Sequence, residues 1–371
     1  MKINVTYIVS NINKSLAFEW VVQNLSKEKF NLSFVLLNPA ETYLQKFLEK
    51  NNIPTLFITY KGKRDAVSAL LKTKRFLKLQ KTKIVHCHLF DAALIGLSAA
   101  KLGGVKKRIY TRHHSTYHHL YHPGSVKWDK LCNRLSTDII SISNVVSETL
   151  KEKENVPASK ISVIHHGFDL QKFSHPDPSI TAPLRKKYNP FNKHPVIGVI
   201  SRFTEWKGVQ YIVPAFKNIL NNYPNALLLL FNAEGNYAAE INKMLGELPE
   251  NSVKKIVFEN DITSVYPLFD LFVHTPIDSH SEAFGQVYIE ALAAGIPGIF
   301  TLSGIANEFI ENKVNALVVP SKNSEAIQEA IIKLLSDEKL VQYITAQGAK
   351  DVAEKFNLEK MVLSLECLYA D

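Results

Sequence analysis

Residues 84–114 read IVHCHLFDAALIGLSAAKLGGVKKRIYTRHH. An apolar, strand-like run, Ile84–His88, is followed by a helical pattern over Ala92–Leu102 and by a second strand-like run, Arg108–Thr111. A strand, a helix and a strand in this order predict a βαβ unit with parallel strands. Ligands of such folds bind at the carboxyl ends of the strands.

The same alternation of strand-like and helical patterns continues on both sides of this unit and recurs in the second half of the chain. Strand-like runs in the first half are Ile3–Val9, Leu32–Leu37, Pro54–Thr59, Ile84–His88, Arg108–Thr111, Asp138–Ile142 and Ile161–His165. Those in the second half are Pro195–Ser201, Ala226–Phe231, Lys255–Phe258, Leu271–His274, Gly298–Thr301 and Ala316–Val319. Two such series predict an α/β fold with two doubly wound, Rossmann-like domains that face each other across a cleft.

A proline-rich stretch, His175–Pro195, separates the two series, and its prolines and charges are typical of a linker. A chain of 371 residues is also longer than a single hydrophobic core usually supports. We therefore expect a first domain over residues 1–175, a linker over 176–194 and a second domain over 195–355. An amphipathic helix within 356–371 is expected to cross back to the first domain.

The composition is that of an ordinary globular protein, with 46% hydrophobic and 21% charged residues. No apolar run approaches the roughly 20 residues of a membrane-spanning helix, and the N-terminal run lacks the features of a signal peptide. The three cysteines, Cys87, Cys132 and Cys367, lie far apart, which favours reduced thiols in a cytoplasmic protein. The net charge of +9 is compatible with anionic partners of several kinds.

The stretch with the most distinctive chemistry, residues 281–298, reads SEAFGQVYIEALAAGIPG. Gly285 permits close approach of the backbone at the expected start of a helix, where free N–H groups favour phosphate or sugar oxygens. Glu282 precedes this helix, and Glu290 lies a little over one turn inside it. Carboxylates at these positions can each accept hydrogen bonds from hydroxyl groups, one from a sugar and one from a ribose.

A second stretch, residues 202–208, reads RFTEWKG and follows a strand-like run. Arg202 and Lys207 therefore lie at an expected strand-to-helix turn, where cations and the start of a helix can hold a diphosphate. Taken alone, each is also compatible with an ordinary surface cation. The two glutamates described above favour the functional interpretation.

Histidines follow the carboxyl ends of two successive strand-like runs. His88 ends one run, and His113 and His114 follow the next, so their side chains are expected at the ligand-binding edge of the sheet. His88 is equally compatible with a histidine packed in the core. His118 and His119, further along the chain, are expected to line the acceptor side of the cleft.

The histidines after residue 113 also raise the question of a zinc site, because pairs of histidines at i and i+4 can bind zinc. No carboxylate lies among them in the sequence, where the nearest are Asp91 and Asp129. The Asp-x-Asp motif of metal-dependent sugar transfer does not occur either. We therefore expect no metal ion.

The stretch 281–298, with its Phe-Gly and Ala-Ala-Gly-Ile-Pro segments, resembles the E-x7-E motif of the GT4-like (group 1) glycosyltransferases, which have the GT-B fold. The resemblance implies that Glu282 binds hydroxyl groups of the donor sugar and that Glu290 binds the ribose. Phe284 and Gly285 are assigned to the same donor-binding loop.

The other two motifs resemble further parts of the same family. The family's R-x4-K-G pattern implies that Arg202 and Lys207 neutralise the departing diphosphate, and its T-x-H pattern implies that His113 lies near the anomeric carbon. His114 takes that place if the register is shifted by one residue. Asn232, in the turn after a strand-like run, is assigned to the donor site on the same basis.

The resemblance implies a retaining glycosyltransferase that needs no metal ion or other cofactor and moves a sugar from a nucleotide-sugar donor to a glycan or lipid-linked acceptor. Bacterial cell-surface polysaccharide synthesis is the implied setting. A nucleotide-sugar epimerase of the same fold and an inactive module that binds a glycan or a protein partner stay open as alternatives. Departures from the family pattern at Ser10–Lys14, Asn232–Gly235 and Glu259–Asn260 leave the nucleotide base open.

The segment Lys61–Lys83 holds nine Lys or Arg and a single acid, Asp65. A helix with this charge can lie on an anionic membrane, each cation contributing about 1 kcal/mol. An ordinary sheet-covering helix with a solvated basic face is equally compatible with the pattern. No nucleic-acid recognition motif accompanies these cations, so nucleic acid is not expected as a partner.

Overall fold

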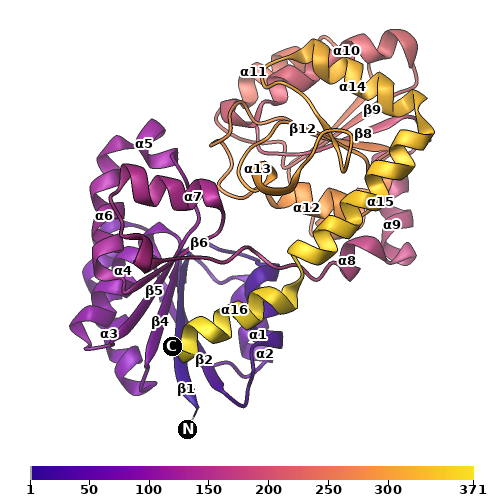
Figure 1. The fold of residues 1–371 in the computed structure, drawn as a ribbon. Helices are drawn as coiled ribbons and strands as arrows, with labels where there is room; N and C mark the ends of the chain where they lie inside the picture. Colours follow the sequence, from indigo (N-terminus) through magenta and orange to yellow (C-terminus); the bar gives the residue numbers. More distant parts are fainter. Residues whose placement is uncertain (1) are drawn as a thin grey trace. The chain divides into compact units, whose positions relative to one another are not determined.

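The structure, a computed structural model, describes residues 2–371. The chain forms two compact units (Figure 1). The first extends to Phe168 and includes Leu358–Asp371, and the second consists of Asp169–Asn357. Each unit contains one sheet of parallel strands, which confirms the α/β architecture that the alternation predicts.

The sheet of the first unit has the strand order β3-β2-β1-β4-β5-β6-β7. Its strands are β1 (Ile3–Ser10), β2 (Phe30–Asn38), β3 (Thr55–Thr59), β4 (Ile84–His88), β5 (Lys107–Arg112), β6 (Asp138–Ser141) and β7 (Ile161–Val163). The strands pair in parallel, and β4 is buried along its whole length, as expected of a central strand with helices on both faces.

The helices of the first unit cover both faces of its sheet (Figure 1). They are α1 (Leu16–Asn24), α2 (Tyr43–Lys50), α3 (Ala66–Leu79), α4 (Phe90–Leu102), α5 (Tyr117–Tyr121), α6 (Val126–Leu135), α7 (Asn144–Glu148) and α16 (Leu358–Ala370). Alternate residues of β1 face opposite sides, as the pleat of a strand requires. Tyr7 packs with α1, α2 and α16, whereas Ile8 packs with α3 and α4.

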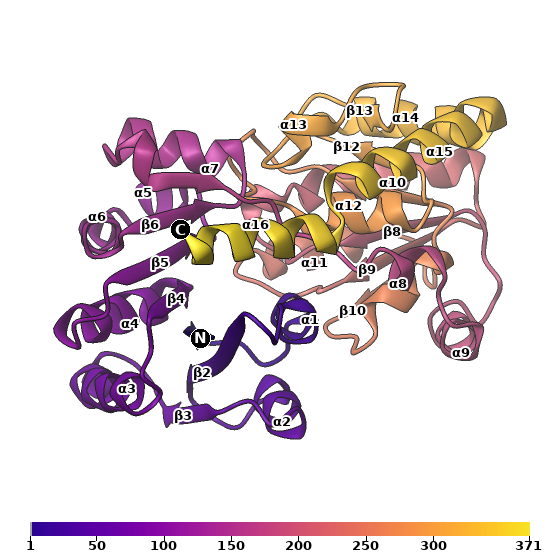
Figure 2. The ribbon, with the colours of Figure 1, turned by 60° about the horizontal axis from the view of Figure 1, so that its bottom comes forward.

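The last helix, α16, belongs to the first unit although the second unit precedes it in the chain (Figure 2). Met361, Leu365 and Tyr369 recur at helical spacing and enter the core that α1 and α2 share with the sheet. The Glu366 carboxylate, on the same helix, accepts a hydrogen bond of 2.8 Å from the backbone N–H of Ser26. The end of the chain is therefore part of the core of the first unit.

The sheet of the second unit has the strand order β10-β9-β8-β11-β12-β13, again with parallel pairing. Its strands are β8 (Val196–Ile200), β9 (Leu227–Phe231), β10 (Val253–Ile256), β11 (Leu271–His274), β12 (Gly298–Phe300) and β13 (Leu317–Val318). Its helices are α8 (Gln171–Ser174), α9 (Pro178–Tyr188), α10 (Val209–Asn222), α11 (Ala238–Leu245), α12 (Gln286–Ala293), α13 (Ala306–Phe309), α14 (Ser324–Ser336) and α15 (Glu338–Lys355). The buried faces of α10, α11 and α14 share one core with the sheet.

The structure differs from the linker expected at 176–194, because the boundary between the units falls at Phe168 and this segment forms α9 within the second unit. Pro178 occupies the first turn of α9, where proline fits without loss of a hydrogen bond, and Asp177 caps that turn. Tyr188 at the other end is buried and donates a hydrogen bond to Glu259. In this proline-rich segment, which predicts a linker, Pro178 thus marks the start of a packed helix.

No helix in the part of the chain that the structure describes is long and apolar enough to cross a membrane.

Candidate functional site

Glu282 lies in the loop between β11 and α12, beyond the carboxyl end of the sheet of the second unit. Its carboxylate can only accept, so the 2.9 Å contact with His274 Nε2 is a hydrogen bond donated by the imidazole. Lys207 Nζ donates to the same carboxylate oxygen. The backbone N–H of Glu282 donates to Ser303 Oγ at 2.9 Å, so contacts from three other segments hold this one residue.

The charges of this cluster are well defined. Burial alone would raise the pKa of Glu282, but the Lys207 ammonium and the hydrogen bond from His274 outweigh burial and lower the pKa to about 2. Burial lowers the pKa of His274, so the imidazole is neutral and its proton lies on Nε2. An ionised carboxylate beside one ammonium and one neutral donor is well suited to hydrogen bonding with sugar hydroxyl groups.

Two glycines allow the loops around Glu282 to approach each other closely. Gly208 adopts φ 74°, and a Cβ at this position would lie 1.8 Å from the carbonyl oxygen of Thr275. Gly285 adopts φ 90°, and a Cβ there would lie 2.6 Å from the ring of Tyr288. Only glycine fits both positions, so the turn after β8 and the start of α12 stay next to the end of β11.

The two candidate cations of the β8 turn differ in their surroundings. Lys207 is mostly buried and pairs with Glu282. Arg202, just beyond the end of β8, is exposed, and no carboxylate of residues 2–371 forms an ion pair with it. The structure thus brings Lys207 and Glu282 together and leaves the Arg202 guanidinium open to a ligand at the carboxyl end of β8.

Glu290, inside α12, has a different electrostatic environment from Glu282. Burial raises its pKa to about 7, although a 2.6 Å hydrogen bond from the Tyr266 hydroxyl opposes part of that rise. No cation of the described chain forms an ion pair with it. Near neutral pH, the Glu290 carboxyl is therefore present in both its protonated and its ionised form.

Asn232 and Phe284 have different local structures although both were assigned to the donor site. Asn232 follows β9 in the left-handed region at φ 57°, and its carbonyl accepts from the backbone N–H of Glu234 at 2.8 Å. It therefore lies at the carboxyl edge of the sheet, beside the β8 turn. The ring of Phe284 is buried edge-on against Phe356, which points to a role in anchoring the loop rather than in contact with a ligand.

In the first unit, the structure brings together His88 at the end of β4 and His113 just after β5. His88 Nδ1 and His113 Nε2 lie 3.1 Å apart. Burial lowers the pKa of both imidazoles, so both are neutral and one donates to the other. The ring of His166 stacks on His113 with 5.6 Å between the ring centroids. His88 Nε2 is buried and has no hydrogen-bond partner within residues 2–371.

His114, His118 and His119 are held by two carboxylates that are completely buried. His118 Nδ1 lies 2.6 Å from Asp129, and His114 Nε2 lies 3.2 Å from the other oxygen of the same carboxylate. His119 Nε2 lies 3.1 Å from Glu154. These three histidines therefore form one side of a charged network, which is distinct from the neutral pair formed by His88 and His113.

The ligand atoms of His114, His118 and Asp129 lie within 4.8 Å of one another, a spacing that could bring them onto one metal ion. Asp129 does not lie among these histidines in the sequence, because it comes from α6. However, Arg112 is also completely buried, 3.4 Å from the Asp129 carboxylate and 2.6 Å from Glu154. A divalent cation at this point would face a fixed buried positive charge, which disfavours the metal interpretation.

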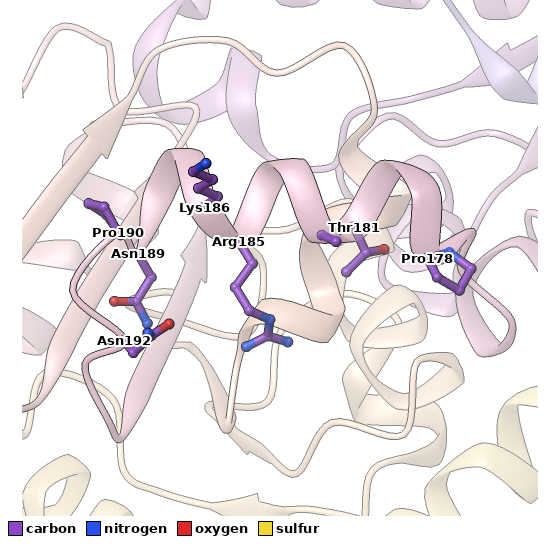
Figure 3. Close-up of a pocket in the computed structure, with 8 residues that line it drawn as sticks. Pro178, Thr181, Arg185, Lys186, Asn189, Pro190 and Asn192 are labelled. Atoms are coloured by element: carbon purple, nitrogen blue, oxygen red, sulfur yellow. The ribbon is translucent and has the colours of Figure 1, made fainter.

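Two surface depressions of the second unit differ in their relation to these residues. One, of about 470 Å³, follows α9 and the loop after it (Figure 3). It is lined by Pro178, Thr181, Ala182, Arg185, Lys186, Asn189, Pro190 and Asn192, and by none of the candidate residues. The other, of about 380 Å³, lies beside the Glu282 loop and is lined by Asp278, Ser279, Thr301, Leu302, Val318, Val319, Pro320 and Ser321.

Several residues of the site were not identified from the sequence. His274, Ser303 and Tyr266 hold the two glutamates, and His166 stacks on His113. A signal was present for His274, because a polar residue ends an apolar strand at the ligand-binding edge of a parallel sheet. The same signal was present for His166, which directly follows the strand-like run Ile161–His165, whereas Ser303 and Tyr266 do not end an apolar strand.

The chain matches the sequence model of the family described as "Glycosyl transferases group 1" over residues 181–351, and that of "Glycosyltransferase Family 4" over residues 21–172. It is 23% identical over 364 residues to the UDP-Gal:alpha-D-GlcNAc-diphosphoundecaprenol alpha-1,3-galactosyltransferase of Escherichia coli, with 94% of this chain and 90% of that protein covered. It is 29% identical over 317 residues to the capsular polysaccharide biosynthesis glycosyltransferase CapM of Staphylococcus aureus, with 82% of this chain and 80% of that protein covered.

The fold is also similar to that of HepE from Anabaena, whose crystal structure holds UDP and glucose. The TM-score is 0.83, with 20% sequence identity and 99% of both chains covered. At 20% identity this similarity supports the fold alone, and it confirms the GT-B fold that the resemblance implied.

Proposed function

Because this chain belongs to the group 1 glycosyltransferases, we propose that it is a retaining enzyme that transfers a sugar from a nucleotide-sugar donor to a glycan or lipid-linked acceptor. The E. coli relative is named for a lipid-linked acceptor, and the S. aureus relative for capsular polysaccharide biosynthesis. We therefore infer that this enzyme works in bacterial cell-surface polysaccharide synthesis, at the cytoplasmic face of the membrane.

The observation that carries the proposal is the cluster of Lys207, Glu282 and His274. It joins an ionised carboxylate, an ammonium and a neutral imidazole at the carboxyl edge of a parallel sheet. Glu282 supplies an acceptor for hydroxyl groups of the donor sugar. Glu290, on the same helix start, supplies the acceptor for the ribose, so the two glutamates define the two ends of the donor.

The leaving diphosphate gains negative charge as the glycosidic bond breaks, and cations aimed at it stabilise the transition state. Arg202 and Lys207 flank one turn and supply two such charges. We propose that these side chains do the work that a metal ion does in metal-dependent sugar transfer, so the reaction should need no added metal.

We propose that His113, a residue of the first unit, acts next to the anomeric carbon of the donor sugar. Its pKa is lowered by burial, so it acts as a neutral hydrogen-bonding group and not as a cation. A neutral imidazole can hold a hydroxyl group of the sugar without adding charge. His114 pairs with Asp129 instead, which favours His113 for this role.

The test uses the purified full chain with UDP-galactose, UDP-glucose, UDP-N-acetylglucosamine and GDP-mannose, each with and without a GlcNAc-diphospholipid acceptor. Transfer that retains the α configuration in the product, measured by the anomeric proton coupling, and that persists with EDTA supports the proposal. Conversion of a donor without acceptor would instead indicate an epimerase. Tight binding of a donor with no turnover on any acceptor would indicate a binding module.

The basic segment supports a further part of the proposal, contact with an anionic membrane. Helix α3 buries Ala69, Thr73 and Leu77 and leaves Leu71 and Leu79 exposed. A groove of about 630 Å³ lies where the carboxyl ends of α3 and α4 meet. Four cations that line it, the basic-groove cations, are Lys74, Arg75, Lys78 and Lys81.

None of the basic-groove cations forms an ion pair within the described residues. Unpaired cations beside exposed leucines are typical of surfaces that bind anionic lipid headgroups. The structure is thus compatible with the membrane interpretation of this segment, which we propose as the way the enzyme reaches a lipid-linked acceptor.

A further inference from the structure

The last turn of α16 places Tyr369 in the core of the first unit. Its side chain is 2% exposed, and its ring packs edge-on against Phe30 with 5.6 Å between the ring centroids. Its hydroxyl lies 2.5 Å from the hydroxyl of Tyr7, in β1 at the other end of the chain. A buried hydroxyl needs hydrogen-bond partners, and Tyr369 has a second one in β4.

That second partner is His86, whose Nδ1 lies 2.7 Å from the Tyr369 hydroxyl. The Nε2 atom of His86 lies 2.6 Å from the hydroxyl of Thr111 in β5. Burial lowers the pKa of His86 to about 3, so its imidazole is neutral and carries one proton. The four groups Tyr7, Tyr369, His86 and Thr111 therefore form a single chain of hydrogen bonds across four elements, β1, α16, β4 and β5.

The protons of this chain must all point in one direction. If Tyr369 donates to His86 Nδ1, then His86 Nε2 carries the proton and donates to Thr111, and Tyr7 donates to Tyr369. The opposite direction reverses every bond and moves the His86 proton to Nδ1. In either case Tyr369 provides the only hydrogen-bonded link between Tyr7 and His86 within residues 2–371, so loss of its hydroxyl leaves the Tyr7 hydroxyl and His86 Nδ1 without that partner.

This chain of hydrogen bonds lies against His88 of the neutral histidine pair. The rings of His86 and His88 lie 4.2 Å apart, and the ring of Tyr7 stacks on His88 with 5.1 Å between the centroids. Thr111 lies two residues before His113 at the end of the same strand. The members of the chain therefore contact one histidine of the pair directly and fix the strand end that carries the other.

We propose that Tyr369 is a positioning residue for sugar transfer, whose hydroxyl orients the pair of His88 and His113 through Tyr7, His86 and Thr111. The proposal rests on the role assigned to His113 in the proposed function. It makes the orientation of these histidines depend on α16, which follows the whole second unit in the sequence.

The test is Tyr369→Phe, which keeps the ring against Phe30 and removes only the hydroxyl. We expect kcat to fall about tenfold or more, because small displacements of reacting groups have effects of this order. The Kd of the free nucleotide should not change, since the residues proposed to bind its ribose and diphosphate lie in the second unit. The nitrogen chemical shifts of His86, His88 and His113, measured by NMR with 15N-labelled histidine, should change as well.

Two control variants separate positioning from simple loss of stability. Leu365→Val weakens the packing of the same helix but keeps the hydroxyl, and Tyr343→Phe removes an exposed hydroxyl from α15. Both should retain kcat and the histidine shifts when measured well below Tm. Thr111→Val, which cuts the chain at its other end, should change the shifts of His86 and serves if Tyr369→Phe does not fold.

The proposal is overturned if Tyr369→Phe keeps kcat within twofold of the wild type, if it loses kcat with unchanged histidine shifts, or if Leu365→Val causes the same loss. Absence of transfer by the wild-type chain on any acceptor would refute the proposed function instead. The histidine shifts would in that case still decide whether Tyr369 positions the pair.

Discussion

The two glutamates of the donor site differ in pKa, and this difference predicts how nucleotide affinity depends on pH. Burial raises the pKa of Glu290 to about 7. If ribose hydroxyl groups donate to its carboxylate, a bound nucleotide selects the ionised form. The apparent Kd of the nucleotide is then multiplied by a factor of one plus the ratio of protonated to ionised Glu290. This factor is about 11 at pH 6 and about 1.1 at pH 8. Binding should therefore weaken about tenfold from pH 8 to pH 6.

Isothermal titration calorimetry with UDP and GDP measures both the affinity and the proton that accompanies binding. In buffers of different ionisation enthalpy, about half a proton should be released per nucleotide at pH 7 and almost none at pH 8.5. The terminal phosphate of the nucleotide titrates in the same range. Glu290→Gln cannot ionise at this position, so its proton release and pH dependence report the phosphate alone. The contribution of Glu290 is the difference between the wild type and this variant.

Tyr266→Phe is the matched second variant. The hydrogen bond from Tyr266 lowers the pKa of Glu290, so its loss should move the midpoint of the affinity curve to higher pH. A wild-type curve identical in shape to that of Glu290→Gln would refute the reasoning. It would mean either that the ribose does not contact this carboxyl or that the protonated form binds equally well.

The remaining predictions concern the other charged groups. Lys207→Ala should lower kcat by about 10²-fold or more with a smaller change in donor Kd, because it removes a charge that matters most as the diphosphate leaves; stopped-flow binding and steady-state rates separate the two. His113→Ala should cut turnover with donor affinity nearly intact in the same assays, and His114→Ala should not. Replacement of the four basic-groove cations by Glu should abolish co-sedimentation with phosphatidylglycerol vesicles at low salt but leave phosphatidylcholine controls unchanged. Unaltered co-sedimentation would indicate that α3 is an ordinary sheet-covering helix with a solvated basic face.

Much of the fold could be predicted because parallel strands with helices on both faces leave a strong pattern. The run Ile84–His88 coincides with β4, and the family that the sequence resembles is confirmed by the two family models that match the chain. The segment 176–194 was misread, because proline at the first turn of a helix and proline in a linker look alike in sequence. What distinguishes them is the burial of Tyr188, whose ring packs against Phe231 and whose hydroxyl donates to Glu259, both far along the chain.

Individual residues of the candidate site could be proposed from the sequence, but the contacts between them could not. Lys207 was assigned to the diphosphate of the donor and Glu282 to its sugar, yet the two side chains pair directly across 75 positions of sequence. Asp129 was noted only as a distant carboxylate, although it holds two of the histidines. Such contacts depend on the register of the sheet and on the close approach of loops. Neither can be predicted from the local pattern of residues.

The pairing of Lys207 with Glu282 bears on how one lysine could serve both a carboxylate and a diphosphate. A buried carboxylate that loses its only partner is destabilised by several kcal/mol. Glu282 avoids this, because His274 keeps donating to it at 2.9 Å and Ser303 holds its backbone. Since burial keeps His274 neutral, that bond does not depend on a change of protonation. Lys207 can therefore turn toward an incoming diphosphate while Glu282 keeps its hydrogen bond from His274 and its orientation toward the sugar.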